Sequence, residues 1–341
     1  MNTDEYYFSR RRCGFLTAWL PIVLSGILMA GVPVVSGGAD NHDGVSLQAL
    51  SRSYGFRSWS VQGNTATLLT RFNSLELETG SRRAAFNGIT VWLNSPIEKS
   101  WGRWLIRQVD VDKTVIPLLN PLGKLVPEGF GLVVLDSGHG GNDCGAVMPR
   151  QGMAEKQLTL ELATNVRDIL MRYRVLVRLT RADDQAVPLD DRYHLAAVWK
   201  ADVFVSIHMN AAASSKPSGI ETYILTPAGF PSTADNSGGS ADRNVCPGNR
   251  HDAANMVLGY TLHKSLLKYT HGEDRGVRRS RFVVIRNASC PAALVECGFL
   301  SSRADQQKIL VPSYRNDIAR GIAEGILTYL NTVKRAHQIV P

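Results

Sequence analysis

VFVSIHMN, residues 203–210, is the stretch of sequence that decides the fold. Its first five residues are apolar or small and rich in β-branched side chains, which is typical of a strand buried on both faces of a sheet. A histidine follows directly. Short runs of the same kind recur after residue 130, at 132–136, 175–180, 220–225, 282–285 and 292–296.

Helical periodicity separates or follows several of these runs. Residues 155–173 place their apolar side chains on one helical face, and residues 314–330 repeat an apolar side chain every four positions. Strands that alternate with helices indicate an α/β fold with an open, largely parallel sheet flanked by helices. We assign this larger domain to residues 130–333.

A smaller β-rich domain is predicted at residues 47–120, after a polar linker at 40–46. Strand-like runs lie at 65–69 and 89–93, and turn signals such as Asn87-Gly88 separate them. Residues 80–88 resemble a hairpin of the copper amine oxidase N-terminal-like domains, from which no copper chemistry is carried over. A substrate-docking role and a spacer role both remain open.

The N-terminal segment, residues 1–39, has the features of an export signal. Three arginines, at 10–12, precede an uncharged apolar run that reaches about residue 35, and small residues follow. The run is also long enough to span a bilayer, so a cleaved signal peptide and a retained membrane anchor both remain open. In either case the rest of the chain is exported, and the membrane is met only through this segment.

Charge and cysteine content limit the other classes. The formal net charge is +8, which favours anionic surroundings, but no zinc finger, RNP-like motif or long basic block supports nucleic-acid binding. The five cysteines show no CxxC spacing. A disulfide among the last four and free thiols both remain open.

Four polar residues carry the chemistry that we predict. His139 follows the first strand of the large domain, His208 follows the strand at 203–207, and Glu296 ends the strand at 292–296. Parallel strands gather their ligands beyond their carboxyl ends, so these side chains are expected at one edge of the sheet. Glu155 enters from the start of a helix, after a glycine-containing loop.

Two imidazoles and one carboxylate are the ligand set of a catalytic Zn²⁺ with an open fourth position. We therefore predict that His139, Glu155 and His208 hold zinc. The metal lowers the pKa of a bound water and polarises a carbonyl oxygen, and Glu296 would move the proton from that water to the leaving group.

Each of these residues also has an ordinary structural interpretation. A single histidine after a strand is usually a core or surface residue, and a glutamate at a helix start usually interacts with the helix dipole. Glu296 could pair with an arginine such as Arg275, and His251 could approach the site. The prediction therefore depends on the four residues acting together.

Five motifs resemble those of one enzyme family, from about residue 131 to residue 330. They are VLDSGHGG (134–141), EK (155–156), LTR (179–181) with Leu189 and Arg192, ADVFVSIHMNA (201–211) and PAALVECGFLS (291–301). In this order they resemble the zinc-dependent N-acetylmuramoyl-L-alanine amidases of the amidase type 3 family. Ser137 stands where the family often has proline, and Met209 where it usually has alanine; neither change removes a catalytic group.

The resemblance implies that His139, Glu155 and His208 bind Zn²⁺, that Glu296 is catalytic and that Asn210 helps to position the substrate. The implied reaction is hydrolysis of the amide between N-acetylmuramic acid and L-alanine in peptidoglycan. A zinc peptidase or carboxypeptidase acting on wall peptides and a non-catalytic peptidoglycan-binding protein are the alternatives. The Gly-, Pro- and Ser-rich stretch at 226–250 is predicted to form a rim or lid.

Overall fold

The computed structural model describes residues 44–123, 125, 131–148, 150–233 and 244–339. The signal or anchor predicted at 1–39 lies outside these residues and stays a prediction. Among the described helices, none combines the length and the apolar character that a membrane span requires.

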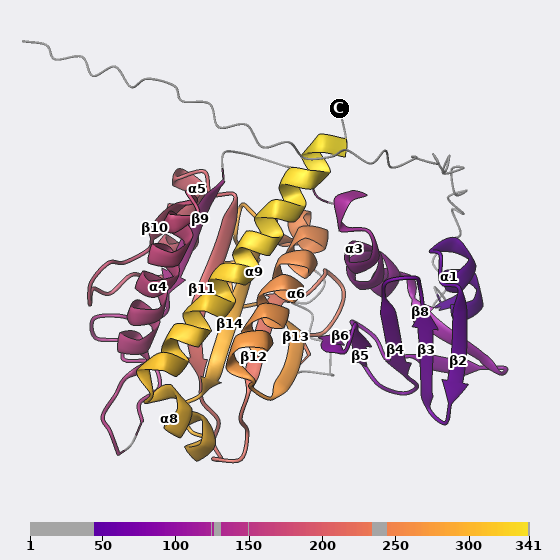
Figure 1. Ribbon diagram of the computed structural model, residues 1–341, viewed down its shortest axis with the longest axis horizontal. Helices are drawn as coiled ribbons and strands as arrows, with labels where there is room; N and C mark the ends of the chain where they lie inside the picture. The colour runs from indigo at the N-terminus through magenta and orange to yellow at the C-terminus, as the bar shows by residue number, and fades with distance from the viewer. Residues whose placement is uncertain (1–43, 124, 126–130, 149, 234–243, 340–341) are drawn as a thin grey trace, which may run out of the picture. The chain divides into compact units, whose positions relative to one another are not determined.

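A sheet of 11 strands runs through the described chain in the order β10-β9-β11-β14-β12-β13-β6-β5-β4-β3-β2 (Figure 1). Strands β10, β9, β11 and β14 are parallel neighbours, whereas β12 runs antiparallel to β14 and parallel to β13. The predicted open, largely parallel α/β sheet is confirmed. Its six strands in the large domain are β9 (Leu132–Ser137), β10 (Leu176–Leu179), β11 (Val203–Asn210), β12 (Ile220–Leu225), β13 (Asp274–Ser280) and β14 (Ala292–Phe299).

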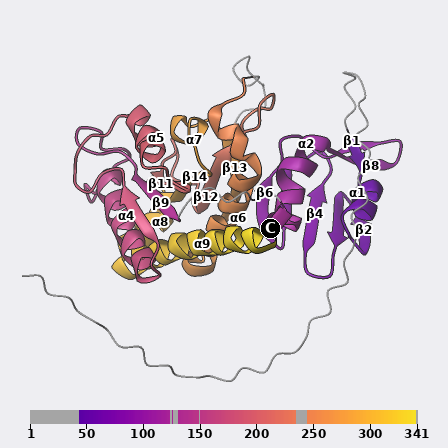
Figure 2. The same ribbon diagram turned by 90° about the horizontal axis from the view of Figure 1, so that it is seen from above.

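Helices cover both faces of this part of the sheet (Figure 2). The amphipathic pattern at 155–173 forms α4, which buries Leu158, Leu162 and Val166 against the larger apolar core. A smaller core joins Phe204 and Leu294 to α7 on the opposite face. The helices are α4 (Glu155–Arg172), α6 (Asp252–Thr270) and α9 (Pro312–Ile339) on one side and α5 (Leu189–Val198) and α7 (Val283–Arg286) on the other, with η4 (Pro247–His251) before α6 and α8 (Arg303–Ile309) before α9.

One predicted strand is wrong. Residues 282–285 were expected to be extended, but residues 283–286 form the single turn of α7. Val284 and Ile285 are buried in the smaller core, as strand residues would have been. A short apolar run satisfies a buried strand and a buried helix turn equally well, so its periodicity could not distinguish them.

The region before residue 120 is β-rich, as expected. The runs at 65–69 and 89–93 become β3 and β6, and Asn87 and Gly88 both take positive φ in the turn before β6. The elements are β1 (Gly44–Ser46), α1 (Leu47–Ser53), β2 (Ser58–Gln62), β3 (Thr65–Leu69), β4 (Ser74–Glu78), β5 (Arg83–Phe86), β6 (Ile89–Trp92), β7 (Glu98–Ser100), β8 (Arg103–Arg107), α2 (Gln108–Asp110), the π-helix η1 (Val111–Val115), α3 (Ile116–Leu119) and η2 (Pro121–Gly123).

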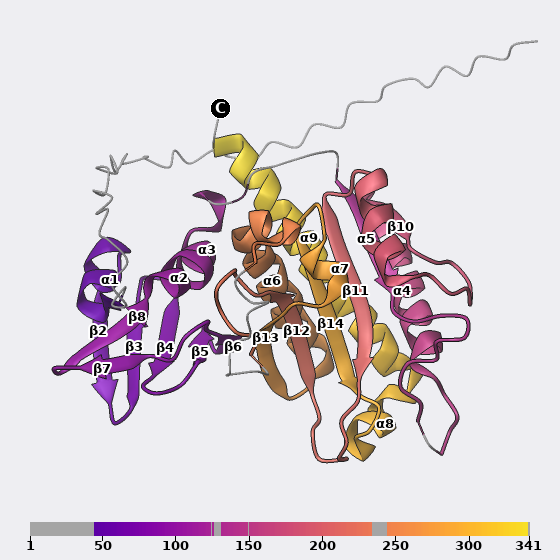
Figure 3. The same ribbon diagram turned by 180° about the vertical axis from the view of Figure 1, so that it is seen from behind.

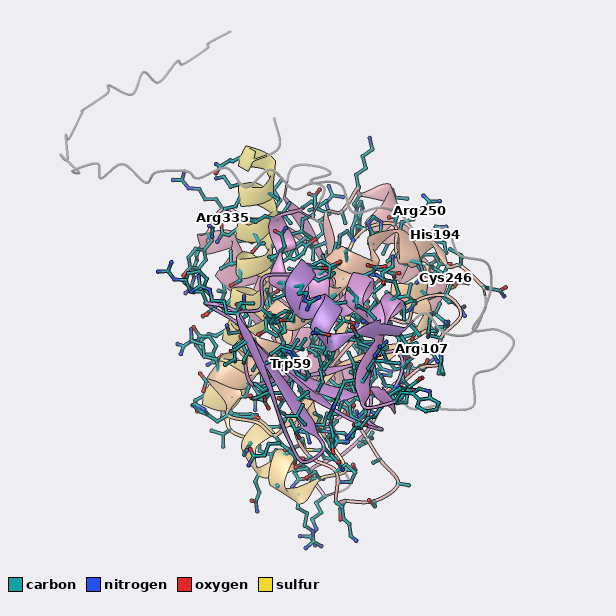
Figure 4. All side chains as sticks on the ribbon, turned by 90° about the vertical axis from the view of Figure 1, so that its right-hand side faces the viewer. Trp59, Arg107, His194, Cys246, Arg250 and Arg335 are labelled. Carbon is teal, nitrogen blue, oxygen red and sulfur yellow. The ribbon has the colours of Figure 1, made fainter. Side chains whose placement is uncertain are left out.

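One feature of this region differs from the predicted polar linker at 40–46. Residues 44–46 are not linker, because they pair with β8 and Ser46 caps α1 through its side chain. At the far edge, all residues of β2 are exposed, including Trp59, which is labelled in Figure 4. The likeness to copper amine oxidase N-terminal-like domains stays a prediction.

Strand β6 joins this region to the large domain by pairing in parallel with β13 at Val91 and Val277. The Thr90 N–H donates to Asp274 Oδ2 at 2.8 Å, and Trp92 Nε1 donates to the Arg275 carbonyl at 3.0 Å. The sequence did not predict β13, because its charged run DRGVRRS lacks a strand pattern. The two regions therefore share one hydrogen-bonded sheet.

Candidate metal centre and active site

The register of the parallel strands places His208 beside Glu296. His208 on β11 pairs with Glu296 on β14, and Ile207 pairs with Ser137 at the end of β9. Directly paired residues of neighbouring strands point to the same face, so His208 and Glu296 share one face. Phe204 and Leu294 lie an even number of residues before them and pack against α7, so this is the face that carries α5 and α7, the helices seen there in Figure 3. The sequence pattern predicted this convergence correctly.

Three potential ligand atoms, one each from His139, Glu155 and His208, lie within 4.8 Å of one another. Glu155 Oε1 is 3.1 Å from His139 Nε2 and 3.0 Å from His208 Nδ1. The two imidazole rings stand edge to face, with their centroids 5.0 Å apart. Two nitrogens and one carboxylate oxygen this close together form a donor set that suits Zn²⁺.

Glycines make room for this cluster. A Cβ on Gly138 would lie 2.4 Å from His208 Cε1, and a Cβ on Gly145 would lie 2.5 Å from Glu155 Oε2. Gly145 also has a φ of +63°, which other residues rarely adopt. His139 itself takes a φ of +61°, a conformation that costs free energy and is common at functional sites.

A buried polar network fixes the loop after β9. Asp136 accepts hydrogen bonds from Thr180, Ser206 and Arg192 at 2.7–2.8 Å. Arg192 also donates to the His139 carbonyl at 2.9 Å. Arg181 donates to the carbonyls of residues 137 and 138 at 3.0 and 2.9 Å. These guanidiniums therefore hold the backbone that carries the first histidine.

Carboxylates set the charge state of the cluster. Burial opposes a charge on His139, but hydrogen bonds and charges from Glu155 and Asp143 outweigh it and raise the pKa of the ring. Burial likewise opposes ionisation of Glu155, yet the two histidines hold the pKa of this carboxyl far below its usual range. An ionised Glu155 between two imidazoles is the state that a cation requires.

Glu296 is the opposite case. The residue is half-buried, and its Oε2 atom is buried without a hydrogen-bond partner among the described residues. Burial raises the pKa of this carboxyl well above its ordinary value, and the charges of Glu155 and Glu221 raise it further. Such a carboxyl holds a proton more readily than an exposed one. The alternative pairing with Arg275 is not formed, because Arg275 binds Glu221 instead.

A sequence model of the family Amidase_3, N-acetylmuramoyl-L-alanine amidase, matches residues 133–328 of the chain. The chain belongs to the N-acetylmuramoyl-L-alanine amidase family. The expected family membership, and with it the assignment as a hydrolase, is thereby confirmed.

Curated and solved relatives agree with this assignment. The chain is 35% identical over 206 residues to N-acetylmuramoyl-L-alanine amidase CwlM of Bacillus licheniformis, covering 60% of this chain and 70% of that one. It is 37% identical over 211 residues to an endolysin of Bacillus phage SPP1, with 62% and 70% covered. The catalytic domain of CwlV from Bacillus (Paenibacillus) polymyxa var. colistinus superposes with a TM-score of 0.50 at 34% identity, covering 60% of this chain and 99% of that one.

The other predicted or considered residues of the amidase lie as follows. Asn210, at the end of β11, donates to Glu221 Oε2 at 2.8 Å, so it touches the network beside Glu296; its role toward substrate stays a prediction. His251 is not in the cluster, because its Nε2 lies 3.0 Å from the Ser289 carbonyl. The four described cysteines, Cys144, Cys246, Cys290 and Cys297, are all free thiols.

Sequence reasoning missed Asp143. Its Oδ2 lies 2.8 Å from His139 Nδ1, on the side of the ring away from Glu155, and its Oδ1 accepts the Gly145 N–H at 3.1 Å. A carboxylate on the outer nitrogen of a ligand histidine orients the ring. Only its position four residues after His139 hinted at this contact. The predicted rim at 226–250 stays a prediction, because residues 234–243 lie outside the description.

Proposed function

We propose that this amidase hydrolyses the amide bond between N-acetylmuramic acid and L-alanine in peptidoglycan, with Zn²⁺ held by His139, Glu155 and His208. The observation that carries the proposal is the convergence of three potential ligand atoms within 4.8 Å beside Glu296, whose Oε2 has no hydrogen-bond partner in the described part of the chain. When bound, zinc would supply Lewis acidity and activate water at neutral pH.

The residues of the chain divide the remaining work. Asp143, Arg181 and Arg192 hold His139 and its loop in place, so that little reorganisation is needed on binding. Glu296 takes the proton of the attacking water and donates it to the leaving nitrogen of L-alanine. The pKa of Glu296 is raised, so its carboxyl takes up a proton more readily than an exposed carboxyl does, as the first transfer requires.

Digestion of purified sacculi tests the reaction. We expect mass spectrometry to find stem peptides that begin with L-alanine, together with intact glycan, and we expect a chelator to abolish their release. Cuts between amino acids would favour the zinc peptidase or carboxypeptidase instead. Binding to sacculi without any released peptide would favour the non-catalytic alternative.

A matched pair of variants tests the role of Glu296. We expect Glu296→Gln to keep its zinc and to lose turnover by about 10²–10⁴-fold, the usual contribution of a general acid–base group. Glu324→Gln is the control, because Glu324 of α9 pairs with Lys268 of α6, outside the metal cluster, and the change should leave turnover unchanged. Full activity of Glu296→Gln would remove the assignment.

We further propose that the enzyme is exported to the cell envelope through residues 1–39, where its substrate lies. Sequencing the N-terminus of the protein recovered from the producing cell distinguishes the two forms. A new N-terminus near residue 40 indicates a cleaved signal, and an intact one in the membrane fraction indicates an anchor. Recovery of the protein from the cytoplasm alone would contradict export.

A further inference from the structure

A row of charged side chains continues from Glu296 across the sheet. Glu296 on β14 pairs directly with Glu221 on β12, so both point to the same face. On the next strand, Arg278 pairs with Tyr223, which shares the face of Glu221 because it lies two residues further along β12. Arg275 reaches the same carboxylate from the start of β13. None of these residues belongs to the metal cluster.

Glu221 holds both arginines in position. Its Oε1 accepts a hydrogen bond from Arg275 Nε and another from Arg278 Nη1, each at 2.8 Å. Its Oε2 accepts from Tyr223 and Asn210 at 2.7 and 2.8 Å. Burial opposes ionisation of Glu221, but these donors outweigh it and lower the pKa of the carboxyl. A buried, ionised carboxylate with four donors is a rigid support for the two guanidiniums.

Each of the two arginines also packs against an aromatic ring. The Arg275 guanidinium lies 5.1 Å from the centre of the Phe299 ring, and that of Arg278 lies 5.0 Å from the centre of the Trp92 ring. Trp92 comes from β6, so the region before residue 120 helps to build this arrangement. Stacked guanidiniums lose little conformational freedom when they bind a planar anion.

The pair retains positive charge and open donors. The Arg275 and Arg278 side chains are 26% and 14% exposed, whereas Glu221 is 3% exposed. Two guanidiniums face one buried carboxylate. Among the described residues, Arg275 also approaches the exposed Glu273, at 4.0 Å, and such an exposed contact is weak. Neither Nη2 atom has a hydrogen-bond partner among the described residues.

We propose that Arg275 and Arg278 form a subsite that binds a free carboxylate of the stem peptide, on the side of Glu296 away from His208. The proposal rests on the proposed function. In the scissile amide the carboxyl of the muramic acid is consumed, and the sugar otherwise carries hydroxyl and acetamido groups. Free carboxylates therefore lie on the peptide side of the bond, and the subsite assigns that side of the substrate to β12 and β13.

The spacing fits the second residue of the peptide. Neighbouring strands lie about 4.8 Å apart, so β13 is about 10 Å from the strand of Glu296. Two extended residues span about 7 Å, and the arginine side chains bridge the remainder. A free α-carboxylate on the glutamate that follows L-alanine lies within this reach, whereas its amidated form, isoglutamine, offers no charge to the pair.

Calorimetry with the peptide product tests the subsite without turnover. The probes are a peptide that begins with L-alanyl-γ-D-glutamate and the same peptide with isoglutamine at the second position. We expect the zinc-loaded enzyme to bind the acid form about tenfold more tightly, as for a charge-assisted hydrogen bond. In Arg275→Met and Arg278→Met this ratio should fall to about one. Equal affinities in the unaltered enzyme, or an unchanged ratio in both variants, would overturn the proposal.

Controls separate loss of recognition from loss of folding. The control is Arg178→Met on the remote strand β10, which removes a guanidinium that lies 5.1 Å from the centre of the Trp199 ring. This variant should keep the full ratio of acid-form to amide-form affinity. If a methionine variant does not fold, Arg275→Lys and Arg278→Lys replace it. Lysine keeps the positive charge beside Glu221 but lacks the planar guanidinium with its paired donors, so we expect an intermediate ratio of affinities. A ratio equal to that of the unaltered enzyme contradicts the subsite.

The matching pair of muropeptides gives the kinetic readout. We expect the acid-to-amide ratio of kcat/KM to fall in the arginine variants in parallel with the ratio of affinities. If neither muropeptide is cleaved, the proposed function fails, while the calorimetry still decides whether the subsite exists. A ratio of kcat/KM that does not follow the arginine substitutions would count against the subsite alone.

Discussion

At the scale of single residues, the site contrasts two carboxylates. Glu155 is ionised by its histidine neighbours, and Glu296 resists ionisation because it is buried near other acids. A third carboxylate, Asp143, is mostly exposed but contacts the outer nitrogen of His139. In the proposed mechanism the same functional group therefore serves as ligand, proton carrier and orienting residue, and its surroundings determine which.

Asp143 gives a prediction about metal affinity. We expect Asp143→Ala to weaken zinc binding by about 10–100-fold, because His139 loses the partner that orients its ring, and Asp143→Asn to have a smaller effect. Competition with a chromophoric chelator measures the affinity. Asp168→Ala, which removes an exposed partner of Arg167, is the control. Equal affinities in all four proteins would show that Asp143 does not orient the ligand.

Glu296 gives a prediction about pH and stability in the metal-free enzyme. Its pKa is raised in the folded state above the reference of 4.5. Below pH 4.5 the carboxyl is largely protonated in both the folded and the unfolded state, so it does not change the free energy of unfolding. As pH rises, the unfolded state ionises first, so folding loses stability until the pH passes the folded pKa. Urea unfolding should therefore find Glu296→Gln more stable than the unaltered chain at pH 7, and the difference should shrink toward pH 4.5; a difference that grows at low pH contradicts this reasoning.

At the scale of elements, the loop between β9 and α4 brings Glu155 next to His139 in the candidate metal cluster. The loop returns Glu155 to the end of β9 through positive-φ positions at residues 139, 140, 141 and 145. Arg181 and Arg192 reach it from β10 and α5. Its composition is polar and glycine-rich, so its conformation depends on these contacts rather than on its own propensity.

Two glycines in or near this loop form a matched test. Gly145 and Gly152 have φ values of +63° and +65°, but only a Cβ at Gly145 would meet Glu155 and His139, since nothing lies within 4 Å of one at Gly152. Each alanine variant should lose about 1–2 kcal/mol of stability from backbone strain. Only Gly145→Ala should also lose zinc affinity, as measured by chelator competition. Comparable zinc affinity in both variants would show that the loop shifts to accommodate the Cβ at residue 145 without disturbing the cluster.

At the scale of the whole described unit, buried charge joins the two β regions. Arg279 of β13 is fully buried and donates to Thr114 Oγ1 at 2.7 Å, while burial lowers its pKa and the charge of Asp110 opposes that shift. Asp110 in turn accepts hydrogen bonds from Asn94 and the Ser95 N–H. The region before residue 120 is therefore built into the same folded unit as the metal cluster.

Removal of Arg279 tests this connection. We expect Arg279→Ala to cost about 3 kcal/mol or more, because Asp110 would stay buried with less compensation. Urea unfolding should show one cooperative transition at lower denaturant, with the exposed Arg178→Ala changed far less. A second, separate transition in the unaltered chain would mean that the two regions unfold independently.

The sequence by itself predicted the α/β class, the convergence of His139, Glu155, His208 and Glu296, and the motifs of the family. These depend on local composition and on the rule that parallel strands end at one edge, which residue order encodes. The sequence could not predict the strands and contacts that surround these four residues. β13 is too charged to be recognised as a strand, α7 has the composition of one, and Asp143 looks like any exposed loop aspartate.

Only the tertiary structure brought Glu221, Arg275, Arg278 and Trp92 into one row beside Glu296. These residues come from three strands and two regions of the chain, and no periodicity links them. Strands β13 and β6 are far apart in the sequence, and their pairing depends on packing and on buried hydrogen bonds. The pattern of a single sequence does not reveal such a pairing. Local chemistry therefore fixed the kind of site, and strand register fixed its surroundings.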